Sequence, residues 1–418
     1  MTPDTAQAAN TENNDDGVVG QLEQSNSAPT GSKAKDRFWP KAKKEDAATG
    51  PKFTDMFIKW HNLYSKFRLF LFLYIWGKNL SRPYYAHFQV TRRCNFRCPS
   101  CQVWRDESYA KGLSLDDIAL LAKNLRQIGV QSVALTGGEV TLRKDILEIV
   151  EIFRQENLLI RFQTNAFLLT EGMIERLFRA GVADFYISLD SMEADIYNRI
   201  NGMTRQGTFD RVLENIEHVA KISKRFGANL FLTTVLRSDN LDAVESLQAY
   251  SEKLGALIGF YGLEVGGEDD PLNIRSNEQE LRGTQESRNL IAAAFKKLID
   301  LPKSKKNNFF VSNKILNDYN QYFSDPDCNM KWSCQAGKLY LEILPEGTVA
   351  VCNATPTIPG YNFRNLPELY SDSAREDIFN KYRTTCSGCV CTRQLEDIAG
   401  NRKDLFNKVR VYLMSVFK

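Results

Sequence analysis

The chain has 418 residues, of which 43% are hydrophobic, so it is long enough for two domains and a large buried core. Charged residues account for 25% and the formal net charge is +3, which excludes nucleic-acid binding through a strongly basic surface. Nine cysteines in a chain of this size, with no apolar signal segment before residue 53, indicate metal ligands in a reducing, cytoplasmic setting rather than the disulfides of a small secreted protein.

Residues 1–52 form a polar N-terminal segment that we expect to be disordered. They are rich in Ala, Asn, Thr, Asp and Gly and contain almost no large apolar side chains, so they cannot build a core. Acidic residues come first in this segment, and a basic run follows that consists of Lys33, Lys35, Arg37, Lys41, Lys43 and Lys44.

Residues 53–82 contain an aromatic, amphipathic helix. Lys59, Lys66 and Arg68 lie on one face, and the apolar run from Leu69 to Trp76 is too short to cross a bilayer. Such a helix behind a basic run lies in a membrane interface or packs against its own catalytic domain, and the sequence leaves both interpretations open. The apolar residues at helical spacing are Phe53, Met56, Phe57, Trp60, Leu63, Tyr64, Phe67, Phe70, Leu71 and Tyr74.

Strands and helices alternate from residue 83 to about residue 300. Repeated strand–helix units predict a parallel sheet, and six units predict a partial (β/α)6 TIM-like barrel with its function at the C-terminal strand ends. Helices are expected near residues 115–128, 144–156, 171–180, 208–224 and 241–254. The expected strands are Tyr85–Val90, Ser132–Thr136, Leu159–Gln163, Asp184–Leu189, Asn229–Leu236 and Leu257–Leu263.

Three cysteines follow the first of these strands directly. Cys94, Cys98 and Cys101 form a C-x3-C-x2-C pattern in one short loop. A [4Fe-4S] cluster is usually held by four thiolates, so three thiolates leave one iron open to a substrate or cofactor. The alternative is a zinc site or a set of structural thiols, but zinc usually takes four ligands and no further Cys or His lies nearby in sequence.

This loop resembles the radical S-adenosylmethionine (radical SAM) superfamily, and motifs after later strands are similar to those of the same family. The resemblance implies that the open iron chelates SAM and that reductive cleavage of SAM yields a 5'-deoxyadenosyl radical. Ser100 departs from the family, which often has an aromatic residue before the third cysteine, and Trp104 is expected to cover the cluster instead. The resemblance assigns SAM contacts to Gly137, Gly138, Glu139, Asn165, Ser188, Asp190 and Arg199.

A second set of cysteines lies in residues 301–418, which we expect to form a small α+β domain. A hairpin of Leu339–Leu344 and Thr348–Val351, turning at Glu346-Gly347, would bring Cys334 and Cys352 together. The C-x12-G-x4-C pattern is similar to the start of the SPASM and twitch domains that follow many radical SAM barrels.

The number of thiolates in this domain predicts one auxiliary [4Fe-4S] cluster. A twitch-like ligand set and a structural zinc site are the alternatives, the former using Cys334, Cys352, Cys386 and Cys389. The ligands that we expect are Cys328, Cys334 and Cys352, with one of Cys386, Cys389 and Cys391.

The resemblance covers residues 83–395 and implies an enzyme that modifies an unactivated C–H position of a peptide or small metabolite. The same chemistry on a lipid or membrane-bound substrate is one alternative, and an iron–sulfur or zinc scaffold without SAM chemistry is another. An electron donor such as a flavodoxin or ferredoxin is implied. Peripheral contact with the inner face of a membrane is favoured by a second amphipathic pattern near the C-terminus, formed by Leu405, Phe406, Val409, Leu413, Val416 and Phe417.

Overall fold

The computed structural model describes residues 52–76, 80–101, 103–105, 112–263, 284–325, 334–353, 355–385, 389–390, 395 and 397–398. Residues 51–418 belong to one compact unit, and the described residues all lie in it. Disorder was predicted for residues 1–52; residues 1–51 fall outside the described residues, and Lys52 is the first residue of a helix. The predicted helix near the C-terminus also falls outside the described residues. So do three of the candidate ligands, which are Cys328, Cys386 and Cys391.

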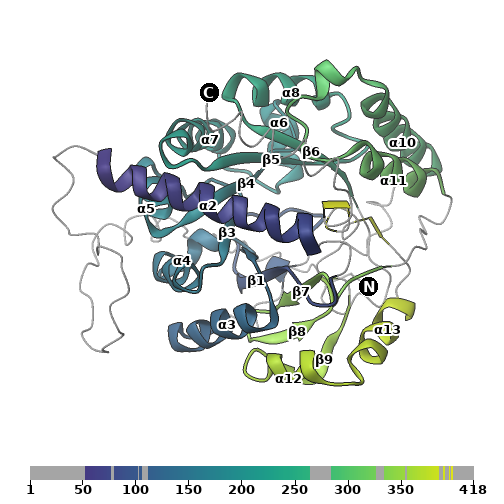
Figure 1. Ribbon diagram of the computed structural model, residues 1–418. Helices are drawn as coiled ribbons and strands as arrows, with labels where there is room; N and C mark the ends of the chain where they lie inside the picture. Colours follow the sequence, from purple (N-terminus) through teal and green to yellow (C-terminus); the bar gives the residue numbers. More distant parts are fainter. Residues whose placement is uncertain are drawn as a thin grey trace, which may run out of the picture. The chain divides into compact units, whose positions relative to one another are not determined.

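A nine-stranded sheet in the order β6-β5-β4-β3-β2-β1-β7-β8-β9 forms the centre of this unit (Figure 1). Strands β1 to β6 are parallel, which confirms the predicted partial barrel and all six predicted strands. Their bounds are Tyr85–Thr91 (β1), Ser132–Gly137 (β2), Leu159–Thr164 (β3), Val182–Ser188 (β4), Asn229–Leu236 (β5) and Leu257–Gly262 (β6).

Amphipathic helices follow the strands and cover the outer face of the barrel (Figure 1). They begin at polar caps, as where the Ser114 hydroxyl accepts a hydrogen bond from the Asp117 amide. Short 3-10 helices are η2 (Val103–Arg105), η3 (Val140–Leu142), η4 (Lys224–Phe226) and η5 (Lys303–Lys306). The α-helices are α3 (Leu115–Ile128), α4 (Ile146–Gln155), α5 (Glu171–Ala180), α6 (Ala194–Ile200), α7 (Thr208–Ser223), α8 (Ala243–Leu254), α10 (Gln285–Asp300), α11 (Asn313–Ser324), α12 (Leu366–Ser371) and α13 (Arg375–Thr385).

The C-terminal hairpin extends the barrel sheet instead of forming a sheet of its own. Strand β7 (Tyr340–Ile343) pairs in parallel with β1, and it pairs antiparallel with β8 (Thr348–Ala350), which in turn pairs with β9 (Thr357–Asn362). The hairpin turns at Gly347, whose φ of 86° suits glycine. The predicted hairpin is therefore present, but the boundary expected near residue 300 does not divide the sheet.

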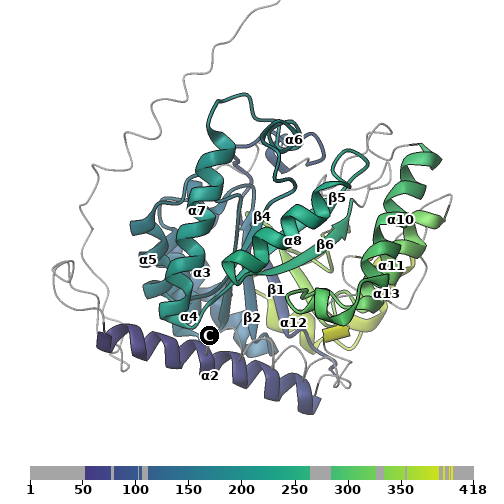
Figure 2. The same ribbon diagram turned by 90° about the horizontal axis from the view of Figure 1, so that it is seen from above.

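Helix α2 (Lys52–Trp76) lies across the end of the barrel at which strands β3 and β5 begin (Figure 2). Its polar side makes the attachment: the Asn62 amide donates to the Phe226 carbonyl at 2.9 Å, and the Lys66 ammonium lies 2.9 Å from the Asp184 carboxylate. The predicted helix is thus confirmed, and it packs on the barrel of its own chain. Within the part of the chain that the structure describes, no helix is both long and apolar enough to cross a membrane.

Candidate functional site

Two glycines at the end of β2 hold the three-cysteine loop close to the sheet. The Gly138 amide donates to the Thr91 carbonyl at 2.8 Å, and the Glu139 amide donates to the Arg93 carbonyl at 2.8 Å. A Cβ at Gly137 would lie 2.1 Å from the Thr91 carbonyl oxygen, and one at Gly138 would lie 2.2 Å from that of Arg93. We expected these glycines to admit a ligand; in the structure they admit the backbone of the cysteine loop.

Glu139 joins the ends of β2 and β3 from a fully buried position. One carboxylate oxygen accepts from the Thr141 amide, the Thr141 hydroxyl and the Thr164 hydroxyl, and the other accepts from the Asn165 amide at 2.8 Å. Burial raises the pKa of Glu139, while these four donors favour the carboxylate. Asn165 extends this network into the cysteine loop, because its side-chain amide donates to the side-chain oxygen of Asn95 at 2.8 Å.

The three thiols of the loop lie near one another and form no disulfide. Burial raises the pKa of Cys94, Cys98 and Cys101, and negative charge on the other two thiols raises that of Cys98 further. Metal ligation requires thiolates, so a bound cation would reverse these shifts. No three His, Cys, Asp or Glu side chains among the described residues lie close enough to hold a single metal ion. A four-iron cluster places each thiolate on a different iron, and so suits a wider spacing.

The segment after α6 contacts the three-cysteine loop from the side opposite the two glycines. The Arg97 amide donates to the Asn201 carbonyl at 3.2 Å, and the Cys98 sulfur lies 3.4 Å from the Asn201 side-chain oxygen. Gly202, with φ +61°, passes so close that a Cβ would lie 2.1 Å from the Arg97 carbonyl oxygen. The Trp104 indole donates to the Cys98 carbonyl at 3.1 Å, so Trp104 contacts the loop, and its predicted place over the cluster stays a prediction. The sequence analysis did not select Asn201 or Gly202.

The structure brings most of the predicted SAM residues to this loop. The Glu139 carboxylate raises the pKa of Cys94, and the Asp190 carboxylate raises that of Cys98, so both groups lie near the thiols. Burial raises the pKa of Asp190 itself to about 6. Ser188 is exposed at the end of β4. Arg199 lies apart, because its side chain is 60% exposed and faces Asp239 at 3.6 Å.

Two unsatisfied polar atoms beside the thiols fit a polar ligand. The Tyr197 hydroxyl is buried and has no hydrogen-bond partner, and the same is true of the Asn95 amide nitrogen. The pKa of Tyr197 is raised by burial and by the charges of Asp190, Cys98 and Glu139, which places its hydroxyl among the site residues. Buried polar atoms are normally hydrogen-bonded, so these two donors are suited to a bound cofactor.

A polar network that the sequence analysis missed lies inside the barrel. His87 contacts the Glu342 carboxylate at 3.2 Å and the Tyr85 hydroxyl at 2.9 Å. Glu342 also accepts from the Gln89 amide at 2.8 Å and from the Tyr340 hydroxyl at 2.5 Å. Alternating polar residues within two otherwise apolar strands were the available signal, since they mark the inner face of a barrel.

The hairpin brings the segments that carry two of the C-terminal cysteines together. The Gly337 amide donates to the Val351 carbonyl at 3.1 Å, which joins the turn after Cys334 to the residue before Cys352. Cys352 is buried, as is Cys389. The hairpin therefore joins the two segments, and the proximity of the two cysteines themselves stays a prediction. The predicted ligand set also includes residues outside the described ranges.

Residues 88–250 match the family described as the Radical SAM superfamily. The chain is 40% identical to the probable GTP 3',8-cyclase of Saccharolobus solfataricus over 131 residues, which are 31% of this chain and 41% of that protein. It is 26% identical to the PqqA peptide cyclase of Rhodopseudomonas palustris over 325 residues, 74% of this chain and 79% of that protein. The match thus spans less than half of the first relative.

Solved structures agree on the fold. Streptococcus suis SuiB bound to its precursor peptide SuiA shares 15% sequence identity and a TM-score of 0.51, over 88% of this chain and 77% of that chain. The chain thus combines a parallel, partly closed barrel with three cysteines directly after its first strand. Residues 88–250 are identified by the match as a radical SAM domain, and the relatives named above are cyclases.

Proposed function

We propose that Cys94, Cys98 and Cys101 hold a [4Fe-4S] cluster whose open iron binds SAM. When bound, such a cluster supplies the electron that cleaves SAM to a 5'-deoxyadenosyl radical, which abstracts hydrogen from an unactivated carbon. The observation that carries this proposal is the convergence of the three thiols with Glu139 and Asp190 at the C-terminal ends of parallel strands.

The protein's own residues hold the three-cysteine loop in place and would contact SAM. The Gly137-Gly138 backbone and Asn201 fix the loop from two sides. We assign SAM contacts to Glu139 and to the Tyr197 hydroxyl, whose missing partner is supplied by the ligand. The predicted contacts of Gly137, Gly138, Asn165, Ser188, Asp190 and Arg199 stay part of this proposal.

A peptide is the substrate that we propose. The PqqA peptide cyclase matches over 79% of its own length, the longest overlap among the relatives described above. The network of His87 and Glu342 gives the barrel interior hydrogen-bonding groups that suit the amides of a peptide better than a lipid chain. A small metabolite is the second candidate, and an electron donor such as a flavodoxin or ferredoxin completes the reaction.

The C-terminal cysteines are proposed to hold one auxiliary [4Fe-4S] cluster. Support comes from the hairpin, which joins the segments of Cys334 and Cys352, and from the burial of Cys352 and Cys389. With Cys334 and Cys352, the other two of its four ligands would be Cys328 and one of Cys386, Cys389 and Cys391.

Iron and sulfide counts after anaerobic reconstitution test both assignments. The wild type should hold about eight irons, and a variant with Cys94, Cys98 and Cys101 all replaced by Ala should hold about four. Ser100→Ala, a change within the same loop that removes no thiol, is the matched control and should match the wild type. If the wild type holds about four irons and the triple Ala variant holds none, only the N-terminal loop binds iron. That result would favour zinc at the C-terminal cysteines.

A further inference from the structure

Helix α2 exposes its aromatic side chains and buries polar ones, the reverse of an ordinary surface helix. Trp60 and Tyr64 are each 64% exposed, and Phe67 is 58% exposed. Exposed large hydrophobic side chains recur along one face of α2 from Met56 to Trp76, and this aromatic stripe is about 30 Å long. Nine large hydrophobic side chains are exposed in the described part of the chain, and eight of them lie on α2: Met56, Phe57, Trp60, Tyr64, Phe67, Leu71, Ile75 and Trp76.

Polar contacts fix this orientation of the helix. Asp55 forms ion pairs at 2.8 Å with both Arg179 and Arg225, and Lys66 reaches Asp184 in the barrel. Turning the aromatic stripe inward would bury apolar groups, but it would break the two ion pairs of Asp55 and the fully buried pair of Lys66 and Asp184, and breaking a buried pair is costly. These polar contacts therefore stabilise the orientation of α2 in which its aromatic face points outward.

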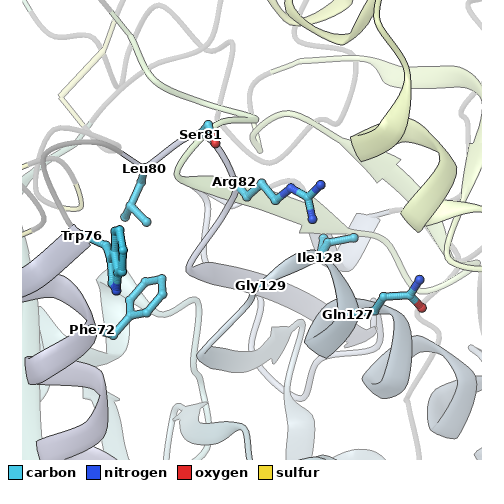
Figure 3. Close-up of a pocket in the computed structure, with 8 residues that line it drawn as sticks. All are labelled: Phe72, Trp76, Leu80, Ser81, Arg82, Gln127, Ile128 and Gly129. Atoms are coloured by element: carbon cyan, nitrogen blue, oxygen red, sulfur yellow. The ribbon is translucent and has the colours of Figure 1, made fainter.

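A cavity of about 340 Å³ adjoins the C-terminal end of the stripe (Figure 3). Phe72, Trp76 and Leu80 form its apolar side. The exposed side chain of Arg82 lies on the other side, next to Ile128 at the end of α3. Apolar side chains on one side and the Arg82 cation on the other suit a ligand that has an apolar chain and an anionic headgroup.

We propose that the aromatic face of α2 docks this enzyme onto an anionic lipid bilayer, with a headgroup phosphate at Arg82. Trp and Tyr favour the membrane–water interface, and an aromatic helix of this kind lies in the interfacial plane. Charge is complementary: Asp55 is the only acidic residue of α2 and is buried, and a run of six Lys and Arg residues between residues 33 and 44 precedes the helix.

The docking face and the cysteine loop lie at opposite ends of the barrel strands. Helix α2 contacts η4, just before β5 begins, whereas the loop follows the C-terminal end of β1. A six-residue strand spans about 20 Å, so lipid on α2 is separated from the thiols by the depth of the sheet. The bilayer is therefore an attachment surface and not the source of the substrate, and the inference is independent of the proposed chemistry.

Vesicle co-sedimentation of the full-length protein tests the proposal, with vesicles of phosphatidylcholine alone and of phosphatidylcholine mixed with phosphatidylglycerol. The wild type should bind the anionic vesicles more tightly. Replacing Trp60, Tyr64 and Phe67 together by Ser should weaken binding by about tenfold or more, because the inserted apolar area is lost. Leu290→Ser is the matched control, since Leu290 is 53% exposed but lies on α10, and it should bind as the wild type does.

Wild-type protein that stays off the anionic vesicles overturns the proposal, as does equal binding by the triple variant. A wild-type oligomer that the triple variant dissociates, without vesicle binding, also overturns it and identifies a second copy of the chain as the occupant. Arg82→Gln should lower binding to anionic vesicles by about twofold to fivefold, and an unchanged affinity removes the cavity from the docking site. SAM cleavage without vesicles should be equal in wild type and triple variant, which separates docking from chemistry.

Discussion

Gly138, which packs against the backbone of the three-cysteine loop, gives the sharpest test of how the site is assembled. A Cβ at position 138 would lie 2.2 Å from the Arg93 carbonyl oxygen and 2.6 Å from that of Arg92. Cβ atoms in proteins essentially never lie within 3.0 Å of another atom, and the shorter of these two distances is about 0.8 Å less than that. Both neighbours are backbone atoms, which cannot rotate away as a side chain could. Gly138→Ala must therefore displace the loop that bears Cys94.

The cost follows from overpacking and from lost hydrogen bonds. Overpacking a tight site costs about 1–3 kcal/mol, and each backbone hydrogen bond that the displaced loop gives up costs about 0.5–1.5 kcal/mol. The Gly138 and Glu139 amides make two such bonds to the loop. We expect Gly138→Ala to lower the free energy of unfolding by about 2–6 kcal/mol and to reduce the iron retained by the N-terminal cluster.

Urea unfolding of the metal-free protein and iron analysis of the reconstituted protein measure the two effects. Gly172→Ala is the matched control, because a Cβ there meets no atom within 4 Å and lies in helix α5. It should stabilise the protein by up to about 1 kcal/mol, the helix preference of Ala over Gly. Equal effects of the two substitutions would refute the close approach of loop and sheet.

Three further substitutions test separate parts of the structure. Lys66→Met removes the cation that faces buried Asp184, which keeps the hydrogen bond from Asn229, and should cost about 3–5 kcal/mol in urea unfolding. Lys221→Met breaks an exposed ion pair and should cost less than about 1 kcal/mol, and similar costs of the two changes would argue against the buried pair. Burial raises the pKa of Asp190 from 3.8 to about 6, so the folded protein binds this proton more tightly than the unfolded chain. The wild type should therefore lose stability relative to Asp190→Asn as the pH rises from about 4 to about 6, and a constant difference would contradict the shift. Tyr197→Phe removes a buried hydroxyl without a partner, so stability should be kept while SAM affinity, measured by equilibrium dialysis, falls by about threefold or more; unchanged affinity would remove Tyr197 from the site.

Local sequence patterns were sufficient to predict the barrel. Each of the six strands is a short apolar run, and each lies between turn residues and an amphipathic helix, so periodicity alone separates them. The three-cysteine loop was equally visible, because its spacing is local. The hairpin at Gly347 was also predicted, since a glycine between two alternating runs indicates a tight turn.

Features that depend on long-range contacts could not be predicted. Nothing in residues 340–343 indicates that β7 pairs with β1, some 255 residues earlier, because strand order is set by the packing of the whole sheet. Asn201 and Gly202 reach the cysteine loop only through the position of α6, and their sequence is that of an ordinary helix end. The network of His87 and Glu342 arises from that same strand pairing.

Helix α2 shows how burial can reverse an amphipathic pattern. Its aromatic stripe was visible in the sequence, and the usual expectation is that such a stripe packs inward. Asn62 and Lys66 instead find partners at the barrel end, and these specific polar contacts decide which face is buried. Periodicity predicts that two faces exist, whereas only the partner groups determine which one meets the protein.

Formation of 5'-deoxyadenosine tests the central claim most directly. The anaerobically reconstituted wild type, given SAM and dithionite, should release 5'-deoxyadenosine, and the variant with Cys94, Cys98 and Cys101 replaced by Ala should release none. Ser100→Ala should retain the activity, because it leaves all three thiols in the same loop. An equal rate in the wild type and the triple Ala variant, or no product from a wild type that holds its iron, would contradict the assignment of radical SAM chemistry to this loop.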